Sequence, residues 1–121
     1  MTARDIVVAF LKALEARDLP AASAMLASNA IMTFPSGQKF STLQQLVAWS
    51  AGRYKFVRKT YDHFDELPRG DVTTVYVRGN LNGEWLDGSA ISNVRYLDRF
   101  DIKDGKIIRQ DVWNDLAEVR P

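Results

Sequence analysis

The Asp104-Gly105 dipeptide constrains the fold of this chain more than any other local feature. It separates two runs rich in β-forming residues, 93–102 and 107–113. A type I′ turn needs positive φ at both of its central residues, so Asp-Gly between two such runs is a strong hairpin signal. With these two residues in the turn, Lys103 pairs with Lys106, and the sequence predicts an antiparallel hairpin near the C-terminus.

The register of this hairpin predicts a pair of acids, Asp98 and Asp111, facing each other on one side of the sheet. Two carboxylates about 5 Å apart disfavour double ionisation, so they would share a proton. One would then act as a general acid and the other as a base. Their predicted neighbours on the same face are Tyr96, Phe100, Arg109 and Trp113.

Composition is that of an ordinary globular chain. Its 121 residues suit one domain, 1–121, and 46% are hydrophobic and 26% charged. The net charge is +1 and the sequence has no long runs of one sign, so its charge does not indicate binding to nucleic acid or membranes. The chain has no Cys, and its N-terminal region lacks a signal-peptide pattern. We therefore expect a cytoplasmic protein.

Helical patterns fill the first half of the chain and extended patterns the second. Capping residues predict helices from Thr2 to about Arg17, after Asp18, and after the Ser41–Gln44 capping box to near Gly52. A short strand is expected at 29–34. Longer strands are expected at 56–67, 72–85, 89–102 and 107–113. This order predicts an α+β fold in which helices cover one face of a curved antiparallel sheet.

Almost the whole chain resembles the nuclear transport factor 2-like superfamily, and more narrowly its SnoaL-like branch. The resemblance implies a cone in which a strongly bent sheet wraps around helices and encloses an apolar pocket. Members include isomerases, hydrolases, dehydratases, polyketide cyclases and non-catalytic binding proteins, so activity depends on the site. The resemblance is carried by residues 6–14, 18–19, 30–37, 97–100 and 104–115.

Site residues of three related families fall on positions of this chain. By resemblance to ketosteroid isomerases, Asp98 takes the place of a protonated acid, Phe10 that of the tyrosine, and Phe34 that of the general base. By resemblance to SnoaL-like polyketide cyclases, Asp111 supplies the acid of the last strand. Compared with limonene epoxide hydrolases, Asp111 again matches an acid, and Gly79, Leu81, Met32 and Phe34 occupy the other four functional positions.

Each candidate group also has a structural interpretation. Asp98 and Asp111 would both be neutralised by Arg109 if they form ordinary salt bridges. His63 is the only histidine and a candidate general base, although a single histidine on a strand is more often packed or exposed. One His without Cys gives no metal-ligand spacing, so no metal site is expected.

Two functions follow from this reading. The first is an enzyme acting on a small, largely apolar organic molecule by isomerase, lyase, cyclase or hydrolase chemistry, with Asp98, Asp111 and His63 as catalytic candidates. The expected pocket residues are Phe10, Met32, Phe34, Tyr96, Phe100, Arg109 and Trp113. No nucleotide motif is present, so we expect a cofactor-independent reaction. The second function is a non-catalytic ligand-binding or interaction module.

A homodimer is expected through the outer face of the sheet. The predicted register leaves an apolar strip with polar edges on that face, and such strips usually mark interfaces. The alternative is a monomer whose tail, 116–119, covers the strip. The residues assigned to this face are Arg95, Leu97, Arg99, Asp101, Ile108, Gln110, Val112 and Asn114.

Overall fold

The computed structural model describes residues 1–120 and contains three helices, α1 (Ala3–Glu15), α2 (Leu19–Ser23) and α3 (Leu43–Ala51). Each begins at a predicted side-chain cap. Thr2 and Asp5 form a capping box at α1, and Asp18 accepts a hydrogen bond from the Ala21 N–H at α2. The capping box of α3 is formed by Thr42 and Gln45, one residue later than predicted. Local capping chemistry thus determines where all three helices begin.

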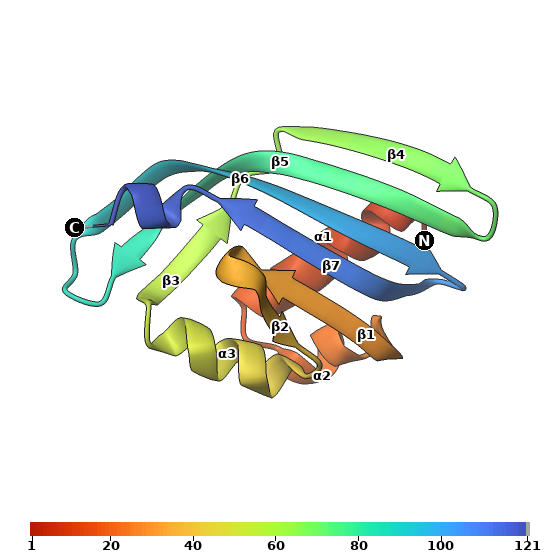
Figure 1. Ribbon diagram of the computed structural model, residues 1–121, viewed down its shortest axis with the longest axis horizontal. Coiled ribbons are helices and arrows are strands. Elements are labelled where there is room, and N and C mark those ends of the chain that lie inside the picture. The colour runs from red at the N-terminus through yellow and green to blue at the C-terminus, as the bar shows by residue number, and fades with distance from the viewer. Residues whose placement is uncertain (121) are drawn as a thin grey trace.

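Seven strands form one curved sheet in the order β2-β1-β7-β6-β5-β3, with β4 paired to β5 (Figure 1). The β1–β7 pair is parallel and every other pair is antiparallel, so the sheet is mixed rather than purely antiparallel. The strands are β1 (Leu26–Phe34), β2 (Gln38–Phe40), β3 (Tyr54–Lys59), β4 (His63–Arg69), β5 (Val72–Trp85), β6 (Ala90–Lys103) and β7 (Lys106–Asn114).

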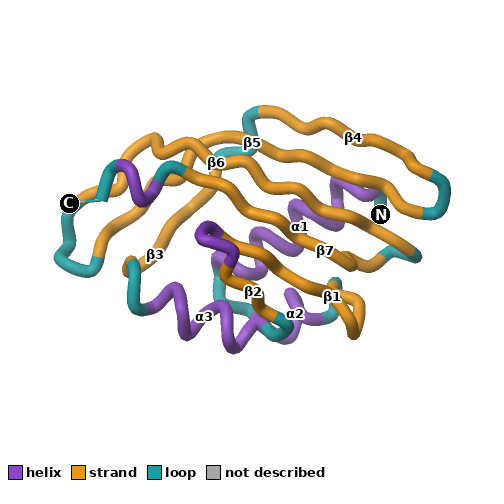
Figure 2. Tube along the Cα trace, viewed as in Figure 1, coloured by secondary structure: helices purple, strands orange, loops and turns teal. Residues whose placement is uncertain are grey.

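Helix α1 lies behind the sheet and crosses β6 and β7, while α3 lies beneath β3 (Figures 1 and 2). The concave face of the sheet and the apolar stripe of α1 therefore form the core. Phe10 of α1 meets Phe100 of β6 edge to face, with ring centroids 6.0 Å apart. This arrangement confirms the predicted α+β cone. The fully buried core side chains include Val7, Phe10, Met32, Val75, Val77, Phe100 and Ile107.

The predicted strand 56–67 is divided into two strands. β3 ends at Lys59 and β4 begins at His63, and both pair with β5. Between them, the chain passes close to Gly79, where a Cβ atom would lie 2.3 Å from the Thr60 carbonyl oxygen. Only a residue without a side chain allows this approach. The break turns β3 toward α3 and leaves Lys59 at the inner side of the sheet.

The β6–β7 hairpin has the predicted turn but not the predicted register. Asp104 and Gly105 have φ values of 52° and 73°, and Lys103 pairs with Lys106. A bulge follows, because Ile102 pairs with Ile107 whereas Asp101 pairs with Arg109. Ile108 is the additional residue. Since side chains alternate along a strand, this one insertion reverses the face of every later residue of β7.

The predicted face-to-face pairing of Asp98 with Asp111 is therefore wrong. Asp98 lies opposite Val112, and Asp111 lies opposite Arg99. Asp98 points into the cone, whereas Asp111 lies on the outer face. The prediction that Arg109 and Trp113 share the inner face with Asp98 is wrong for the same reason. Residues Gln110, Val112 and Asn114, assigned above to the outer face, belong to the inner face.

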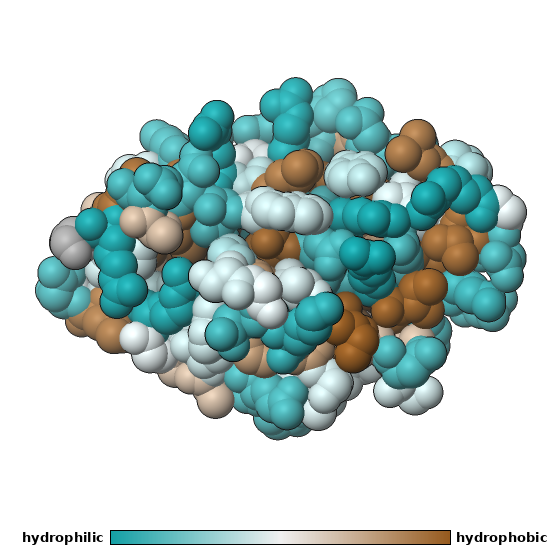
Figure 3. Space-filling model, viewed as in Figure 1, coloured by the Kyte–Doolittle hydropathy of each residue, from teal (hydrophilic) through white to brown (hydrophobic). Residues whose placement is uncertain are grey.

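The outer face carries both charge and exposed apolar side chains. Trp113 is 52% exposed and Ile31 is 41% exposed. Viewed from the outer side of the sheet, the surface shows hydrophobic residues separated by hydrophilic ones (Figure 3). Leu116, in the C-terminal turn, is buried in the core, so its side chain does not cover the outer face of the sheet. Within residues 1–120, no helix is long and apolar enough to cross a membrane.

Candidate functional site

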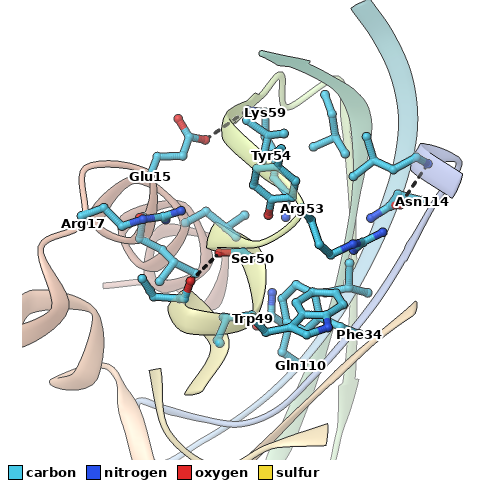
Figure 4. Close-up of a pocket in the computed structure, with 18 residues that line it drawn as sticks. Glu15, Arg17, Phe34, Trp49, Ser50, Arg53, Tyr54, Lys59, Gln110 and Asn114 are labelled. Atoms are coloured by element: carbon cyan, nitrogen blue, oxygen red, sulfur yellow. Dashed lines mark hydrogen bonds between the residues drawn. The ribbon is translucent and has the colours of Figure 1, made fainter. Parts of the chain in front are cut away.

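A cavity of about 70 Å³ lies inside the cone, between α1, α3, β3 and the inner face of β7 (Figure 4). A water molecule needs on the order of 10–15 Å³ of such space, so the cavity has room for several waters or for one small ring. Its apolar lining comes from Leu11, Leu14, Phe34, Leu46, Val47, Val57, Leu81, Val112 and Leu116. Its polar lining comes from Glu15, Arg17, Ser50, Arg53, Tyr54, Lys59, Gln110 and Asn114.

Three aromatic side chains form one wall of the cavity and the layer behind it. Phe34 lies at the end of β1, and its ring centroid is 5.6 Å from that of Trp49 and 5.8 Å from that of Phe40. Trp49 and Phe40 are themselves 5.4 Å apart. Trp49 follows Leu46 by three residues on α3, so it lies beside the buried Leu46 on the same side of the helix and packs against the core. Phe34 thus lines the cavity.

An ion pair connects the cavity to the interior of the sheet. The Lys59 Nζ lies 2.5 Å from the Asp98 Oδ2. The Lys59 side chain is 14% exposed and lines the cavity, while the Asp98 side chain is 0% exposed. Lys59 therefore belongs both to the cavity lining and to the ion pair, whereas Asp98 lies outside the lining.

The environment of Asp98 shifts its proton affinity. Burial raises the pKa of the Asp98 carboxyl above its ordinary value, and the Lys59 ammonium and the Gln110 amide oppose that rise. A carboxyl group whose pKa is perturbed by burial and by one specific charge is a marker of functional sites. The Asp98 Oδ1 is also buried without a hydrogen-bond partner among the described residues, which is unusual for a buried carboxyl oxygen.

Two tyrosines and a glutamate surround the ion pair. The Glu15 Oε2 accepts hydrogen bonds from the Lys59 backbone N–H at 3.1 Å and from the Tyr61 hydroxyl at 3.4 Å. The Tyr96 hydroxyl donates to the Thr60 carbonyl at 2.6 Å, and its ring lies 4.8 Å from the Lys59 Nζ. Burial raises the pKa of both phenols, so they are neutral near pH 7. These contacts fix the end of β3 and therefore the position of Lys59.

Gln110 is the second polar group at the inner end of the cavity. It is 1% exposed and lines the cavity, yet neither its Nε2 nor its Oε1 has a hydrogen-bond partner among the described residues. A buried amide with both ends unpaired costs free energy, and most such groups in proteins have partners. The Gln110 amide also opposes the rise in the pKa of Asp98, so it lies beside that carboxyl and is a polar group shared between Asp98 and the cavity.

The structure brings together only some of the predicted site residues. Asp98, Tyr96 and Phe34 lie on the inner side near the cavity or the ion pair, whereas Phe10, Met32 and Phe100 are packed in the core. The outer face holds Asp111, which Arg109 neutralises at 2.8 Å, together with Trp113. His63 is exposed on β4, where it contacts Asp65 at 3.2 Å. It pairs with Arg78 of β5 and lies away from the cavity.

Lys59 and Gln110 carry no signal in the sequence that marks them as site residues. Lys59 meets Asp98 only through the pairing of β3 and β6 with opposite edges of β5, so no local pattern announces the contact. Gln110 shares strand alternation with Val112, and its inward position follows only once the bulge is known. Among residues 1–120, no three His, Asp or Glu side chains are grouped as metal ligands.

Comparison with known proteins agrees with this architecture. The SnoaL-like domain matches residues 7–110. A nuclear transport factor 2-like protein of unknown function from Burkholderia pseudomallei K96243 is similar, with a TM-score of 0.74 and 18% identity, covering 95% of this chain and 92% of that one. TerC, co-crystallised with polyporic acid, has a TM-score of 0.76 and 14% identity, covering 94% and 92%.

A candidate polyketide cyclase from Pseudomonas putida KT2440 is also similar, with a TM-score of 0.67 and 21% identity, covering 93% of this chain and 91% of that one. A search of curated protein sequences found no significant match. The structural neighbours share the fold at low identity, and the family match spans most of the chain. The chain therefore belongs to the SnoaL-like domain family, within the nuclear transport factor 2-like fold.

Proposed function

We propose that this protein binds a small, largely apolar organic molecule in the cone and acts on it without a cofactor, with Lys59 as the group that meets the ligand. One observation carries the proposal: a lysine and a fully buried aspartate form an ion pair at the wall of an apolar cavity. Replacing a buried ion pair by apolar residues is often neutral or stabilising, so stability alone is a weak reason to keep one. Contact between the Lys59 ammonium group and a ligand is a better reason for this ion pair to be present.

The chemistry suited to this site is stabilisation of negative charge on a ligand oxygen. An ammonium group held in a low-dielectric cavity stabilises a developing enolate or alkoxide more strongly than it would in water. Lys59 would donate a proton to that oxygen and recover one from solvent. Asp98 does not line the cavity, so its proposed role is to position Lys59 and to keep it charged. Isomerisation next to a carbonyl, aldol-type cyclisation and the opening of an epoxide each develop negative charge on an oxygen.

A panel of small ketones and epoxides tests this proposal. Binding is measured by chemical-shift changes at cavity residues, and turnover is measured across pH. We expect Lys59→Met and Asp98→Asn to lower turnover by about a hundredfold, as loss of one oxyanion-stabilising group does. Asp111→Asn is the matched control, because it changes a buried aspartate on the outer face. Equal losses in Asp98→Asn and Asp111→Asn would contradict the assignment.

A non-catalytic binding module is the alternative function. By the family resemblance, Phe10 and Phe34 stand where ketosteroid isomerases keep catalytic groups. Phe10 is fully buried against Phe100, and Phe34 is part of the aromatic wall. Tight binding of panel members without turnover in any of them would favour this function over catalysis.

We also propose that the outer sheet face pairs with a second copy of the chain. Trp113, Ile31 and Leu97 give this face apolar contact area, and charged residues surround them. Arg95 and Arg99 already have intrachain partners in Asp115 and Asp101. The apolar residues therefore supply the contact, rather than the intermolecular ion pairs expected from the sequence.

A further inference from the structure

The cavity lining carries more positive than negative charge. Arg17, Arg53 and Lys59 line it, whereas Glu15 is its one acidic residue among those described. Lys59 has Asp98 as a counterion, but neither arginine has a carboxylate within salt-bridge distance in residues 1–120. The lining thus includes an exposed arginine, Arg17, and a half-buried one, Arg53, neither of which has a partner anion among residues 1–120.

Both arginines are held in place by contacts that leave their charge available. The Arg17 Nη1 donates to the Leu14 carbonyl at 2.7 Å, just beyond the end of α1. The Arg53 guanidinium lies over the Trp49 ring, 4.5 Å from its centroid. Stacking on an aromatic face and bonding to a neutral carbonyl both orient a guanidinium without neutralising it. In Figure 4, Arg17 and Arg53 lie on two sides of Tyr54.

The field of the two arginines converges on the Tyr54 hydroxyl. Burial raises the pKa of Tyr54, and the charges of Arg17 and Arg53 both oppose that rise. A phenol inside the cavity therefore experiences both positive charges. An anionic oxygen placed beside this hydroxyl would experience the same attraction.

Gln110 adds a neutral polar group to the inner end of the cavity, where Lys59 also lies. Gln110, with both amide atoms unpaired, lies near the Phe34 and Trp49 wall in Figure 4. The cavity therefore has a cationic side, an aromatic wall and two amide side chains, Gln110 and Asn114, of which Gln110 is buried and unpaired. Its volume of about 70 Å³ limits a ligand that fits without rearrangement to about one ring.

We propose, resting on the function above, that the ligand is a planar organic acid of about one ring. Its anionic group lies between Arg17 and Arg53 beside Tyr54, its ring lies against Phe34 and Trp49, and a second polar group meets Lys59 and Gln110. Arginine binds carboxylates through paired hydrogen bonds, and the aromatic wall accepts a flat apolar body. Charge at the arginines thus selects the ligand class, and Gln110 orients the ligand.

Benzoate and benzamide provide a matched pair of probes, because they share shape and differ in charge. Affinities are measured by titration at pH 7 and low salt, with chemical shifts of cavity residues to locate the bound probe. We expect benzoate to bind roughly tenfold more tightly than benzamide. Arg17→Gln and Arg53→Gln should each remove most of that preference and leave benzamide affinity unchanged. Gln110→Leu should leave the benzoate preference unchanged, because neither probe carries a second polar group that could meet Gln110.

Lys12→Gln is the control, since it removes one positive charge from an exposed site on α1 that does not line the cavity. It should leave the benzoate preference within about twofold of wild type, as expected for a screened surface charge. Equal affinity for the two probes in the wild-type protein would overturn the acid-selective inference and leave the binding proposal standing. Absence of shifts at cavity residues with both probes at millimolar concentration would overturn both.

Discussion

Lys59 and Asp98 form an ion pair within the cone, with Nζ and Oδ2 2.5 Å apart and the carboxylate wholly shielded from solvent. They belong to strands that do not touch each other, because β5 lies between β3 and β6. Both therefore extend toward the concave side of the sheet over the middle strand. Because the pair is both part of the proposed site and buried in the fold, substitutions in it should change activity and the free energy of unfolding.

Removing one member of the pair should cost more than removing both. Lys59→Met leaves Asp98 buried without a counterion, and uncompensated buried charges typically cost about 3–5 kcal/mol. The double variant Lys59→Met/Asp98→Leu should recover most of that loss. Urea denaturation of the wild type, both single variants and the double variant gives the four unfolding free energies of a double-mutant cycle. Additive effects of the two substitutions would show that the ion pair is not coupled.

The stability of the fold should depend on the ionisation of Asp98. Since the folded pKa is raised, the folded state holds this proton more tightly than the unfolded chain. The stabilising contribution is fully present below the unfolded value, about 4, and is lost as pH rises through the folded pKa. The free energy of unfolding of Asp98→Asn, relative to wild type, should therefore increase with pH above about 4.

Urea denaturation from pH 4 to pH 8 measures this dependence. Phe34→Leu is the control, since it alters the same cavity but removes no titrating group and should shift the wild-type profile uniformly. A stability difference between Asp98→Asn and wild type that stays flat over this range would contradict a raised pKa.

Gly79 and Gly83 should tolerate no side chain. A Cβ at Gly79 would lie 2.3 Å from the Thr60 carbonyl oxygen, and one at Gly83 would lie 2.0 Å from the Phe56 carbonyl oxygen. These oxygens belong to backbone held against β5, so relief would require the strands to separate. We expect each alanine variant to lose more than about 2 kcal/mol of unfolding free energy.

Gly52→Ala is the matched control for these two variants. Its nearest neighbour would be the Trp49 carbonyl oxygen at 3.7 Å, an ordinary contact, and its φ of −83° suits alanine. Its stability should stay within about 1 kcal/mol of wild type. Equal melting temperatures for all three alanine variants would show that β3 can move away from β5.

A dimer through the outer face should dissociate when that face is charged. Trp113→Asp replaces an exposed apolar side chain at the proposed contact, and we expect it to convert a dimer to a monomer of about 13.7 kDa. Leu86→Asp is the control, because Leu86 is comparably exposed, at 51%, in the turn after β5. Sedimentation at micromolar concentration measures both. A monomeric wild-type protein would refute the dimer.

The sequence by itself determined the features that arise from neighbouring residues. Thr2, Asp18 and Asp104-Gly105 place two helix starts and the last turn because capping bonds and positive φ values depend on a few consecutive positions. The family resemblance, carried by such segments, led to the correct cone. The same reasoning placed Asp98 on the inner face, since an apolar alternation surrounds it on β6.

The tertiary structure alone decided which side chains share the cavity. Ile108 enters β7 as one unpaired residue opposite β6, and the pairing of β7 with the parallel strand β1 is also irregular at this point. The alternation of side chains then places Asp111 outward and Gln110 inward. Lys59 reaches Asp98 only because β3 pairs with β5, and the chain can leave β3 past Gly79 because that residue has no side chain. Pairing between distant strands involves every residue of a sheet at once, so no local pattern could determine either contact.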